Sequence, residues 1–261
     1  MRRREFLIAS AGTAGLLIPW ASRASKPCPP PQDGVTGGTS ASTPCTASKT
    51  YTTNFPLTEN PISEGGTWTS IAPELTRVQT EVIGGIHVAH GTQQDNDSHA
   101  PYDDSVATLI GFPQDHSIQG TVWVSPSITA TPNREIELHL RWSEGHSPVQ
   151  RYYGMFTVTG YEININQADQ YFYLYRFGEQ NPLAGSSVNV GTPKTGDVFY
   201  AQITTNPDGS ARIIVKWNGV TCIDYTDTTP ILGGNPGIGF YRDPGTPNNQ
   251  YGFSSITATG L

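Results

Sequence analysis

Lysine and arginine are scarce in this chain. Its 261 residues include 15 basic and 22 acidic side chains, and charged residues make up 14% of the total, compared with the ~25% that is usual in soluble domains. The formal net charge is −7. Nucleic acid is bound mainly through clustered Lys and Arg, so we expect no nucleic-acid partner.

Cysteine is also rare, with Cys28, Cys45 and Cys222 as the three examples. Their spacing fits no metal-binding motif. In an oxidising compartment two of them are expected to pair and one to remain a thiol. The simplest pair is Cys28 with Cys45, which flank a stretch of Pro, Gly, Ser and Thr, and the alternative is Cys45 with Cys222.

Long apolar runs are missing except near the N-terminus, where Phe6 to Trp20 follows three arginines. Arg3-Arg4 with the residues after it resembles the twin-arginine export signal, and an ordinary secretory signal is the alternative. We predict that residues 1–24 are this signal and that cleavage follows Ala24. The mature protein is then periplasmic or extracellular, with no integral membrane segment.

The expected signal changes the charge and the domain boundaries. Its loss removes four Arg and one Glu, which takes the formal net charge from −7 to −10. Residues 25–50 are rich in Pro, Gly, Ser and Thr and cannot bury enough apolar surface to fold. We therefore predict a flexible tail over 25–50 and one folded domain over 51–261.

Glycine and proline are abundant, at 28 and 21 residues, and neither suits a helix interior. Short runs of alternating polarity are separated by turn residues, as in an antiparallel β-sandwich. Two hairpin turns are predicted, at residues 206–209 and at Asn218-Gly219. The candidate strands are Ser117–Val124, Arg134–Trp142, Tyr152–Thr159, Tyr171–Phe177, Asp197–Thr205, Ala211–Trp217, Thr221–Tyr225, Gly237–Arg242 and Gly252–Thr259.

The strand predicted at Arg134–Trp142 concentrates ionisable side chains. Strict alternation places Glu135, Glu137, His139 and Arg141 on one face, opposite Ile136, Leu138, Leu140 and Trp142. In a chain with so little charge we interpret this face as a candidate catalytic site, with a solvated outer face as the alternative. A neutral His139 would act as general base, and Arg141 would neutralise a sugar carboxylate.

Three tyrosines alternate in the strand predicted at Tyr171–Phe177, namely Tyr171, Tyr173 and Tyr175. Aromatic rings stack on the apolar faces of sugars, and the hydroxyl groups add hydrogen bonds. We take Tyr171, Tyr175 and Arg176 as candidate substrate-binding residues and Tyr173 as a further catalytic candidate. The alternative is that these tyrosines serve only strand packing.

An acidic, polar segment lies between residues 95 and 104. Asp95, Asp97, Asp103 and Asp104 offer the hard oxygen ligands that Ca²⁺ prefers, so a structural calcium is the candidate cofactor. A solvated loop is the alternative, because the spacing is not that of an EF-hand. A zinc site at the nearby histidines lacks the usual helical spacing.

The run from Asp197 to Leu261 resembles the concanavalin A-like lectin and glucanase superfamily, and within it the laminin G-like bacterial secreted domains. The resemblance rests on the two hairpins, on Gly234-Asn235-Pro236-Gly237-Ile238-Gly239-Phe240 and on the closing strand near Phe253. It implies an all-β jelly-roll sandwich whose concave groove takes a polysaccharide or other glycan. The superfamily includes lectins, hydrolases, lyases and modules without catalysis.

The resemblance also suggests how the site would act if the protein is an enzyme. Laminarinase-type hydrolases carry three acids on one strand, whereas Glu135-Ile136-Glu137-Leu138-His139 keeps the first two positions and lacks the third. Polysaccharide lyases acting on uronic acids use a tyrosine, a histidine and an arginine together. In this sequence the corresponding candidates are Tyr173, His139 and Arg141. We expect an exported carbohydrate-binding protein, with a lyase or glycoside hydrolase as the alternative and a structural envelope domain as a third interpretation.

Overall fold

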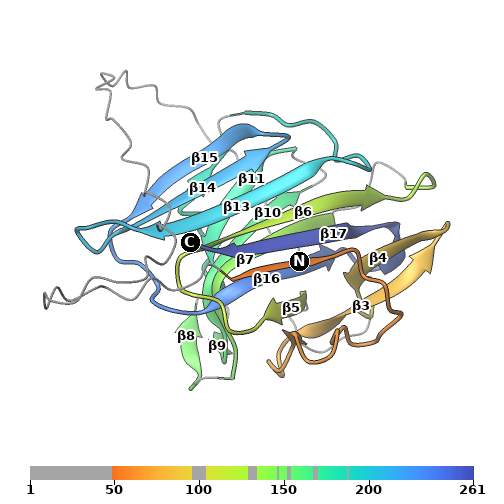
Figure 1. The fold of residues 1–261 in the computed structure, drawn as a ribbon, viewed down its shortest axis with the longest axis horizontal. Coiled ribbons are helices and arrows are strands. Elements are labelled where there is room, and N and C mark those ends of the chain that lie inside the picture. Colours follow the sequence, from red (N-terminus) through yellow and green to blue (C-terminus); the bar gives the residue numbers. More distant parts are fainter. Residues whose placement is uncertain are drawn as a thin grey trace, which may run out of the picture. The chain divides into compact units, whose positions relative to one another are not determined.

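The computed structural model describes most of the chain after residue 48, and the residues described belong to one compact unit (Figure 1). The described ranges are 49–95, 104–128, 134–145, 147–151, 154–166, 170–186 and 188–261. The expected signal peptide, nearly all of the expected tail, Cys28 and Cys45 lie outside these ranges. Within them the only helical element is the single 3-10 turn η1 (Asn248–Gln250), and no helix is long and apolar enough to cross a membrane.

Two antiparallel sheets form the sandwich, which confirms the predicted all-β fold class. The front sheet has the strand order β12-β11-β10-β7-β16-β5, with β2 also paired to β5. Its strands are β12 (Ala184–Gly185), β11 (Phe172–Arg176), β10 (Thr159–Asn166), β7 (Arg134–Ser143), β16 (Asn235–Arg242), β5 (Ser105–Leu109) and β2 (Trp68–Thr69).

The back sheet has the order β4-β17-β6-β13-β14-β15, with β1 also paired to β17. Its strands are β4 (Ile86–Gly91), β17 (Tyr251–Gly260), β6 (His116–Val124), β13 (Val198–Thr205), β14 (Ala211–Trp217), β15 (Val220–Asp227) and β1 (Thr50–Thr53). Strand β3 (Thr76–Ile83) links the two sheets, because it pairs antiparallel with β4 and parallel with β5. A separate hairpin joins β8 (Val149–Arg151) to β9 (Gly154–Phe156).

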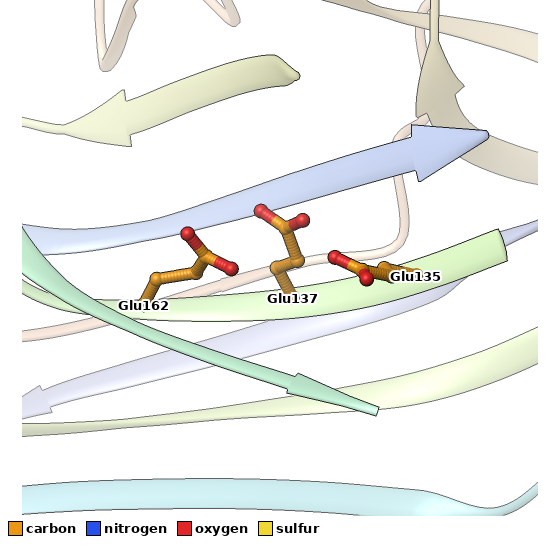
Figure 2. A group of neighbouring side chains, drawn as sticks. All are labelled: Glu135, Glu137 and Glu162. Carbon is orange, nitrogen blue, oxygen red and sulfur yellow. The ribbon is translucent and has the colours of Figure 1, made fainter. Parts of the chain in front are cut away.

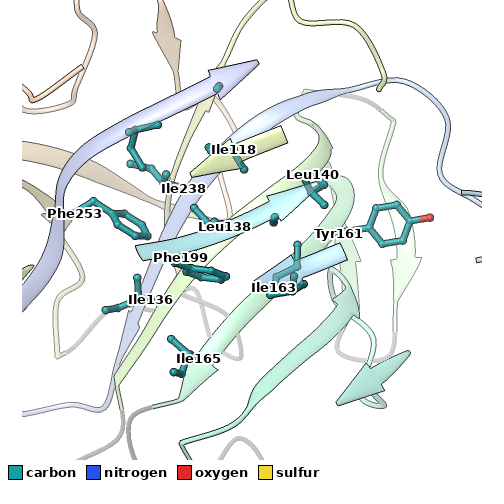
Figure 3. Close-up of a cluster of buried hydrophobic side chains, with 14 of the residues drawn as sticks. Ile118, Ile136, Leu138, Leu140, Tyr161, Ile163, Ile165, Phe199, Ile238 and Phe253 are labelled. Atoms are coloured by element: carbon teal, nitrogen blue, oxygen red, sulfur yellow. The ribbon is translucent and has the colours of Figure 1, made fainter. Parts of the chain in front are cut away.

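The main core lies between the sheets (Figure 3). Alternate residues of the front strands, such as Leu138, Ile163 and Ile238, meet back-sheet residues such as Ile118 and Phe199, and all five are fully buried. This is the period-two alternation of a strand with one face on a core. It follows that the intervening residues of β7, β10 and β16 point to the other side of the front sheet, here called the outer face.

Turn chemistry fixes the back-sheet hairpins. Asn218 and Gly219 both have positive φ, 49° and 82°, as a type I′ turn between β14 and β15 requires. At the preceding turn the Gly209 amide donates to the Asn206 carbonyl over 3.0 Å. Both predicted hairpins are therefore present.

Most predicted strands are observed within a few residues of their expected ends, but the region after Tyr152 differs. The expected strand Tyr152–Thr159 is replaced in the described part by short β9, and β10 begins at Thr159. Cys222, on β15, is buried and is a free thiol within the described residues. Cys28 and Cys45 lie outside these residues, so the pairing of the cysteines stays a prediction.

Candidate functional site

The outer face of the front sheet carries polar residues in register across neighbouring strands. One row runs from Gly239 on β16 through Glu137 on β7 and Asn164 on β10 to Tyr173 on β11. The row on one side contains Gly237, His139, Glu162 and Tyr175, and the row on the other side contains Tyr241, Glu135 and Asn166. Residues from four strands, far apart in sequence, therefore share one surface.

Three glutamates form the centre of this surface, here called the glutamate cluster: Glu135, Glu137 and Glu162. Figure 2 shows their carboxylates standing on the same side of the sheet and turned toward one another. One carboxylate oxygen from each lies within 4.8 Å of the other two. The side chains are 1%, 1% and 0% exposed, which is rare for glutamate.

Asparagine side chains tie the cluster together. The Asn164 amide nitrogen donates to Glu135 Oε2 over 3.0 Å and to Glu162 Oε1 over 2.7 Å. Asn166 donates a longer bond, 3.4 Å, to Glu135 Oε1. The Asn164 carbonyl oxygen, in a fully buried side chain, has no hydrogen-bond partner, and such an atom is costly to leave buried.

His139 is held between the cluster and a second apolar core. Its Nε2 lies 3.1 Å from Glu137 Oε2, and its ring stacks on Trp142 with centroids 3.9 Å apart. Burial lowers the pKa of His139 from 6.5 to about 3, because the charged imidazolium would lose its hydration. The imidazole is therefore neutral at physiological pH, as the expected general base requires, and it fixes the orientation of Glu137.

Glycines on β16 make room for these side chains. A Cβ on Gly239 would collide with Glu137 Oε2 and lie 2.7 Å from His139 Cε1. A Cβ on Gly237 would lie 2.9 Å from the Ala107 carbonyl oxygen and 3.4 Å from the His139 ring. Neither glycine has a positive φ. The need for glycine at these two positions is therefore one of space above the sheet and not of backbone conformation.

The tyrosines line the same face toward the sheet edge. Tyr173 and Tyr175 sit opposite Asn164 and Glu162, with ring centroids 6.2 Å apart. Tyr175 is buried and Tyr173 half-buried, and Tyr171, just before β11, is 36% exposed. The structure thus brings Glu135, Glu137, His139, Tyr173 and Tyr175 onto one surface, with β10 between the glutamates of β7 and the tyrosines.

Arg141 does not belong to this surface, so the expectation that it shares a face with His139 is wrong. A bulge in β7 adds one residue relative to both β10 and β16, and Arg141 has a φ of 47°. The bulge reverses the alternation beyond it. Trp142, expected among the core residues of β7, accordingly joins His139 on the outer face.

The Arg141 side chain crosses instead to the back sheet. The fully buried guanidinium pairs with Asp115 at 2.9 Å and donates to the Thr205 hydroxyl at 2.7 Å and to the carbonyls of Gln114 and Ile231. The guanidinium nitrogens of Arg141 therefore donate their hydrogen bonds to other groups of the protein. A structural role explains the burial of Arg141 without any ligand.

Arg176 also points away from the glutamate cluster. Arg176 is paired with Tyr161, and the next pair along the two strands, Tyr175 with Glu162, points to the outer face. Because successive residues of a strand point to opposite faces, the Arg176 side chain lies on the other side of the sheet. Its Nη2 pairs with Asp227 at 2.8 Å, and the Tyr161 hydroxyl donates to the same carboxylate at 2.6 Å. The structure therefore separates both candidate arginines from the candidate catalytic glutamates and histidine.

The expected calcium ligands are not assembled in the described residues. Asp95 pairs with Arg242 and accepts a hydrogen bond from the Gly245 amide, and Asp104 is fully buried immediately before β5. Asp97 and Asp103 lie outside the described residues. Within the described ranges, the one group of three or more side chains with metal-ligand geometry is the glutamate cluster.

Sequence reasoning missed the part of the site on β10. Tyr161-Glu162-Ile163-Asn164-Ile165-Asn166 alternates apolar and polar residues as cleanly as β7 does, with the apolar set in the core and the polar set on the outer face. That alternation was the available signal. Gly237 and Gly239 gave a second signal, because glycine inside a strand marks a close approach.

The arrangement combines groups that suit polar, ring-shaped ligands. Carboxylates, carboxamides and a neutral imidazole accept or donate hydrogen bonds, and the tyrosine edge offers stacking surfaces. Access differs along the face. Around His139 the second core closes it, formed by Trp142 with Ala72, Leu75, Val106, Phe156, Val158 and Phe177, whereas Tyr171, Tyr173 and Tyr241 are at least partly exposed.

No protein-family model and no curated protein sequence matches this chain. Solved structures do match it. A protein of unknown function from Shewanella oneidensis MR-1, SO2946, is 10% identical with a TM-score of 0.51 and covers 81% of this chain and 86% of its own. That likeness shows a shared fold.

Other solved structures are similar at lower scores. The carbohydrate-binding module CBM66 from Bacillus subtilis is 12% identical, with a TM-score of 0.41 over 77% of this chain and 96% of the module. The exoplasmic/lumenal domain of VIP36, bound to Ca²⁺ and Man3GlcNAc, is 11% identical, with a TM-score of 0.49 over 77% of this chain and 88% of that domain.

Proposed function

We propose that this protein binds a carbohydrate on the outer face of its front sheet, at the edge formed by the tyrosines. The observation that carries the proposal is the alignment of Tyr173 with Asn164 and Glu137 in one row across three strands. Sugar rings present apolar faces rimmed by hydroxyl groups, so they bind where an aromatic surface adjoins hydrogen-bonding carboxylates and amides. This face supplies both.

The exposed end of the face is the entry point in this proposal. Tyr171 is 36% exposed, and Tyr173 and Tyr241 are half-buried. The glutamate cluster lies deeper and shapes the floor. In keeping with the sequence interpretation, we place the protein outside the cytoplasm, with a polysaccharide as ligand and a concanavalin A-like sandwich as the scaffold.

Retention on immobilised polysaccharides tests the proposal. We expect the wild-type chain to be retained by at least one polysaccharide, and a Tyr171→Ala, Tyr173→Ala double variant to lose roughly ten-fold or more in affinity, since each aromatic contact contributes ~0.5–1.5 kcal/mol. The matched control is Tyr200→Ala, because Tyr200 is half-buried on the back sheet. Equal retention of both variants would place binding elsewhere.

Polysaccharide cleavage is the second candidate, and the spacing of the glutamates is the observation that favours it. Retaining glycoside hydrolases use two carboxyl groups ~5 Å apart, and one carboxylate oxygen from each of Glu135, Glu137 and Glu162 lies within 4.8 Å of the other two. Hydrolysis is favoured over elimination from a uronic acid, because Arg141 and Arg176 are paired with Asp115 and Asp227 away from His139.

The same polysaccharides distinguish the two functions. Release of reducing ends indicates a hydrolase, unsaturated products that absorb in the ultraviolet indicate a lyase, and retention without products indicates a binding protein. Glu137→Gln abolishes product formation if the glutamates are catalytic. If the products come from a contaminating enzyme, the Glu137→Gln preparation forms them at the same rate as the wild type.

A further inference from the structure

We infer that the glycan bound on the outer face is an uncharged polysaccharide, and that the face rejects sugars carrying carboxylate, sulfate or phosphate groups. The inference rests on the proposed function and names the class of its ligand. It replaces the expectation that Arg141 neutralises a sugar carboxylate. The placement of the basic side chains, the groups that line the face and the charge of the chain support it in turn.

Four arginines belong to the strands of the face but point away from it. Ten of the 15 lysines and arginines lie within the described ranges, and the other five precede residue 49. Arg141 and Arg176 pair with aspartates on the other side of the front sheet. Arg134 and Arg242 are paired across β7 and β16, in step with the core residue Ile136, so they too lie behind the face.

The other six basic residues lie around the second core, on the back sheet or next to it. Arg77 Nη1 donates to the carbonyls of Ala72 and Leu75 over 2.9 Å each. Arg151 Nε donates to the Phe177 carbonyl over 3.1 Å. The remaining four are Lys49 before β1, Lys194 before β13, and Arg212 and Lys216 on β14. Within the described ranges, no lysine or arginine therefore projects from the outer face of β7, β10, β11 or β16.

The groups that line the face suit hydroxyl groups better than anions. Glutamates, asparagines and tyrosines lie in register there, and His139 beside Glu137 is neutral, because burial lowers its pKa to about 3. An acidic group placed among them leaves water without a lysine or arginine of the described chain to pair with, which is costly. The carboxylates also repel it. The hydroxyl groups of a neutral sugar both donate and accept hydrogen bonds, so they match carboxylates, carboxamides and phenols.

The charge of the whole chain acts in the same direction. The formal net charge is −7. A polyanion that approaches such a chain meets a net repulsion, which lowers its association rate and which salt screens beyond ~8 Å at physiological ionic strength. An uncharged polysaccharide meets no such barrier.

Retention on polysaccharides of both kinds is the first test. We expect the wild-type chain to be retained by an uncharged polysaccharide and to pass over alginate, polygalacturonate and dextran sulfate without retention. Retention on any of these polyanions that is as strong as on the uncharged polysaccharides overturns the inference.

Derivatives of the retained polysaccharide isolate the effect of charge. It is carboxymethylated in one preparation and hydroxyethylated to the same degree in another, so that the two substituents are similar in size. We expect the carboxymethyl form to bind roughly ten-fold or more weakly at low salt, and the difference to shrink as salt screens the charges. Equal or tighter binding of the carboxymethyl form overturns the inference.

Matched variants locate the discrimination on the face. The two affinities are compared as a ratio within each variant, so a general loss of affinity cancels. In a Glu137→Gln, Glu162→Gln double variant we expect the ratio to fall about three-fold or more, because the repulsion is reduced. Glu81→Gln, whose carboxylate on β3 contacts His90, keeps the wild-type ratio. An unchanged ratio in the folded double variant overturns the inference, and if that variant fails to fold the wild-type experiments decide.

Failure of this inference and failure of the proposed function give different results. Stronger retention on polyanions that is lost in the Tyr171→Ala, Tyr173→Ala variant overturns the inference and leaves carbohydrate binding at the tyrosine edge in place. Retention on no polysaccharide of either kind contradicts the proposed function and, with it, the inference.

Discussion

At the scale of single residues, glycine decides whether the candidate site exists. Gly237 and Gly239 lie in the middle of β16, directly opposite His139 and Glu137. The absence of a side chain at Gly239 leaves the space that Glu137 and His139 occupy, and the absence of one at Gly237 allows the Ala107 carbonyl to approach. The polar groups of β7 therefore owe their positions to residues about a hundred positions later in the sequence.

Gly239→Ala tests this dependence. The new methyl group would collide with Glu137 Oε2 and crowd the His139 ring, so we expect a loss of about 1–3 kcal/mol in the free energy of unfolding and weaker glycan retention. Urea unfolding and retention assays measure the two effects.

Gly185→Ala is the matched control. A methyl group at Gly185, on edge strand β12, would make an ordinary 3.7 Å contact with the Tyr173 ring. We expect a change within about 0.5 kcal/mol in the free energy of unfolding. Equal effects of the two substitutions would contradict the packing argument for Gly239.

At the scale of the element, the bulge in β7 separates the residues of one strand into two tasks. Before the bulge, Glu135, Glu137 and His139 share the outer face. At the bulge Arg141 turns to Asp115 and the back sheet. Strict alternation would have placed Arg141 on the same face as these three residues. The polarity pattern of the sequence does not reveal the extra residue of the bulge.

Arg141→Ala is accordingly expected to destabilise the protein and to leave the binding site intact. Loss of a fully buried guanidinium with its Asp115 partner costs roughly 3–5 kcal/mol of the free energy of unfolding, measured by urea denaturation. Each remaining folded molecule should retain glycan normally.

The comparison for that experiment is Arg212→Ala. Arg212 and Asp224 form an ion pair with both side chains nearly half exposed, 47% and 46%, and exposed pairs contribute less than about 1 kcal/mol. An Arg141→Ala protein that is as stable as the wild type but no longer binds glycan would contradict this prediction and would indicate that Arg141 contacts the ligand.

At the scale of the whole molecule, buried titratable groups make stability depend on pH. Burial lowers the pKa of His116 from 6.5 to about 4, and that of His139 to about 3. Between pH 6.5 and these values the unfolded chain binds protons that the folded chain does not. Stability is therefore complete above pH 6.5 and decreases as the pH falls toward 4.

Two carboxylates extend this loss to lower pH. Burial opposes ionisation of Asp115, but hydrogen bonds from Thr205 and Arg141 outweigh it and lower the pKa. For Asp227 burial is likewise outweighed, by hydrogen bonds from Tyr161, Thr229 and Arg176. Their contribution is present above the pKa of an unfolded aspartate, ~3.9, and is lost as the pH falls through the lower folded values.

Urea unfolding at a series of pH values measures this dependence. We expect the free energy of unfolding to fall by roughly 2–4 kcal/mol between pH 7 and pH 4 from His116 alone. In a His116→Gln variant that retains the fold, the slope in this range is smaller. A free energy that is the same at pH 7 and pH 4.5 would contradict the buried, neutral state of His116.

The sequence by itself determined the β-sandwich, because turn residues and period-two alternation act locally. Asn218-Gly219 adopts the positive φ values that its hairpin needs, and Ala211–Trp217 is a strand with the predicted ends. It also identified Glu135, Glu137, His139 and the tyrosine row as unusual, since charge is scarce and these residues alternate in strands.

Only the tertiary structure decided which of these residues meet. Strand order places β10 between β7 and β11, which brings Glu162 into the glutamate cluster and Asn164 beside it, and the β7 bulge turns Arg141 away from the outer face. Such contacts depend on pairing between distant segments and on a shift of one residue in register. Local polarity carries no information about either, so the composition of the site became visible only in the folded chain.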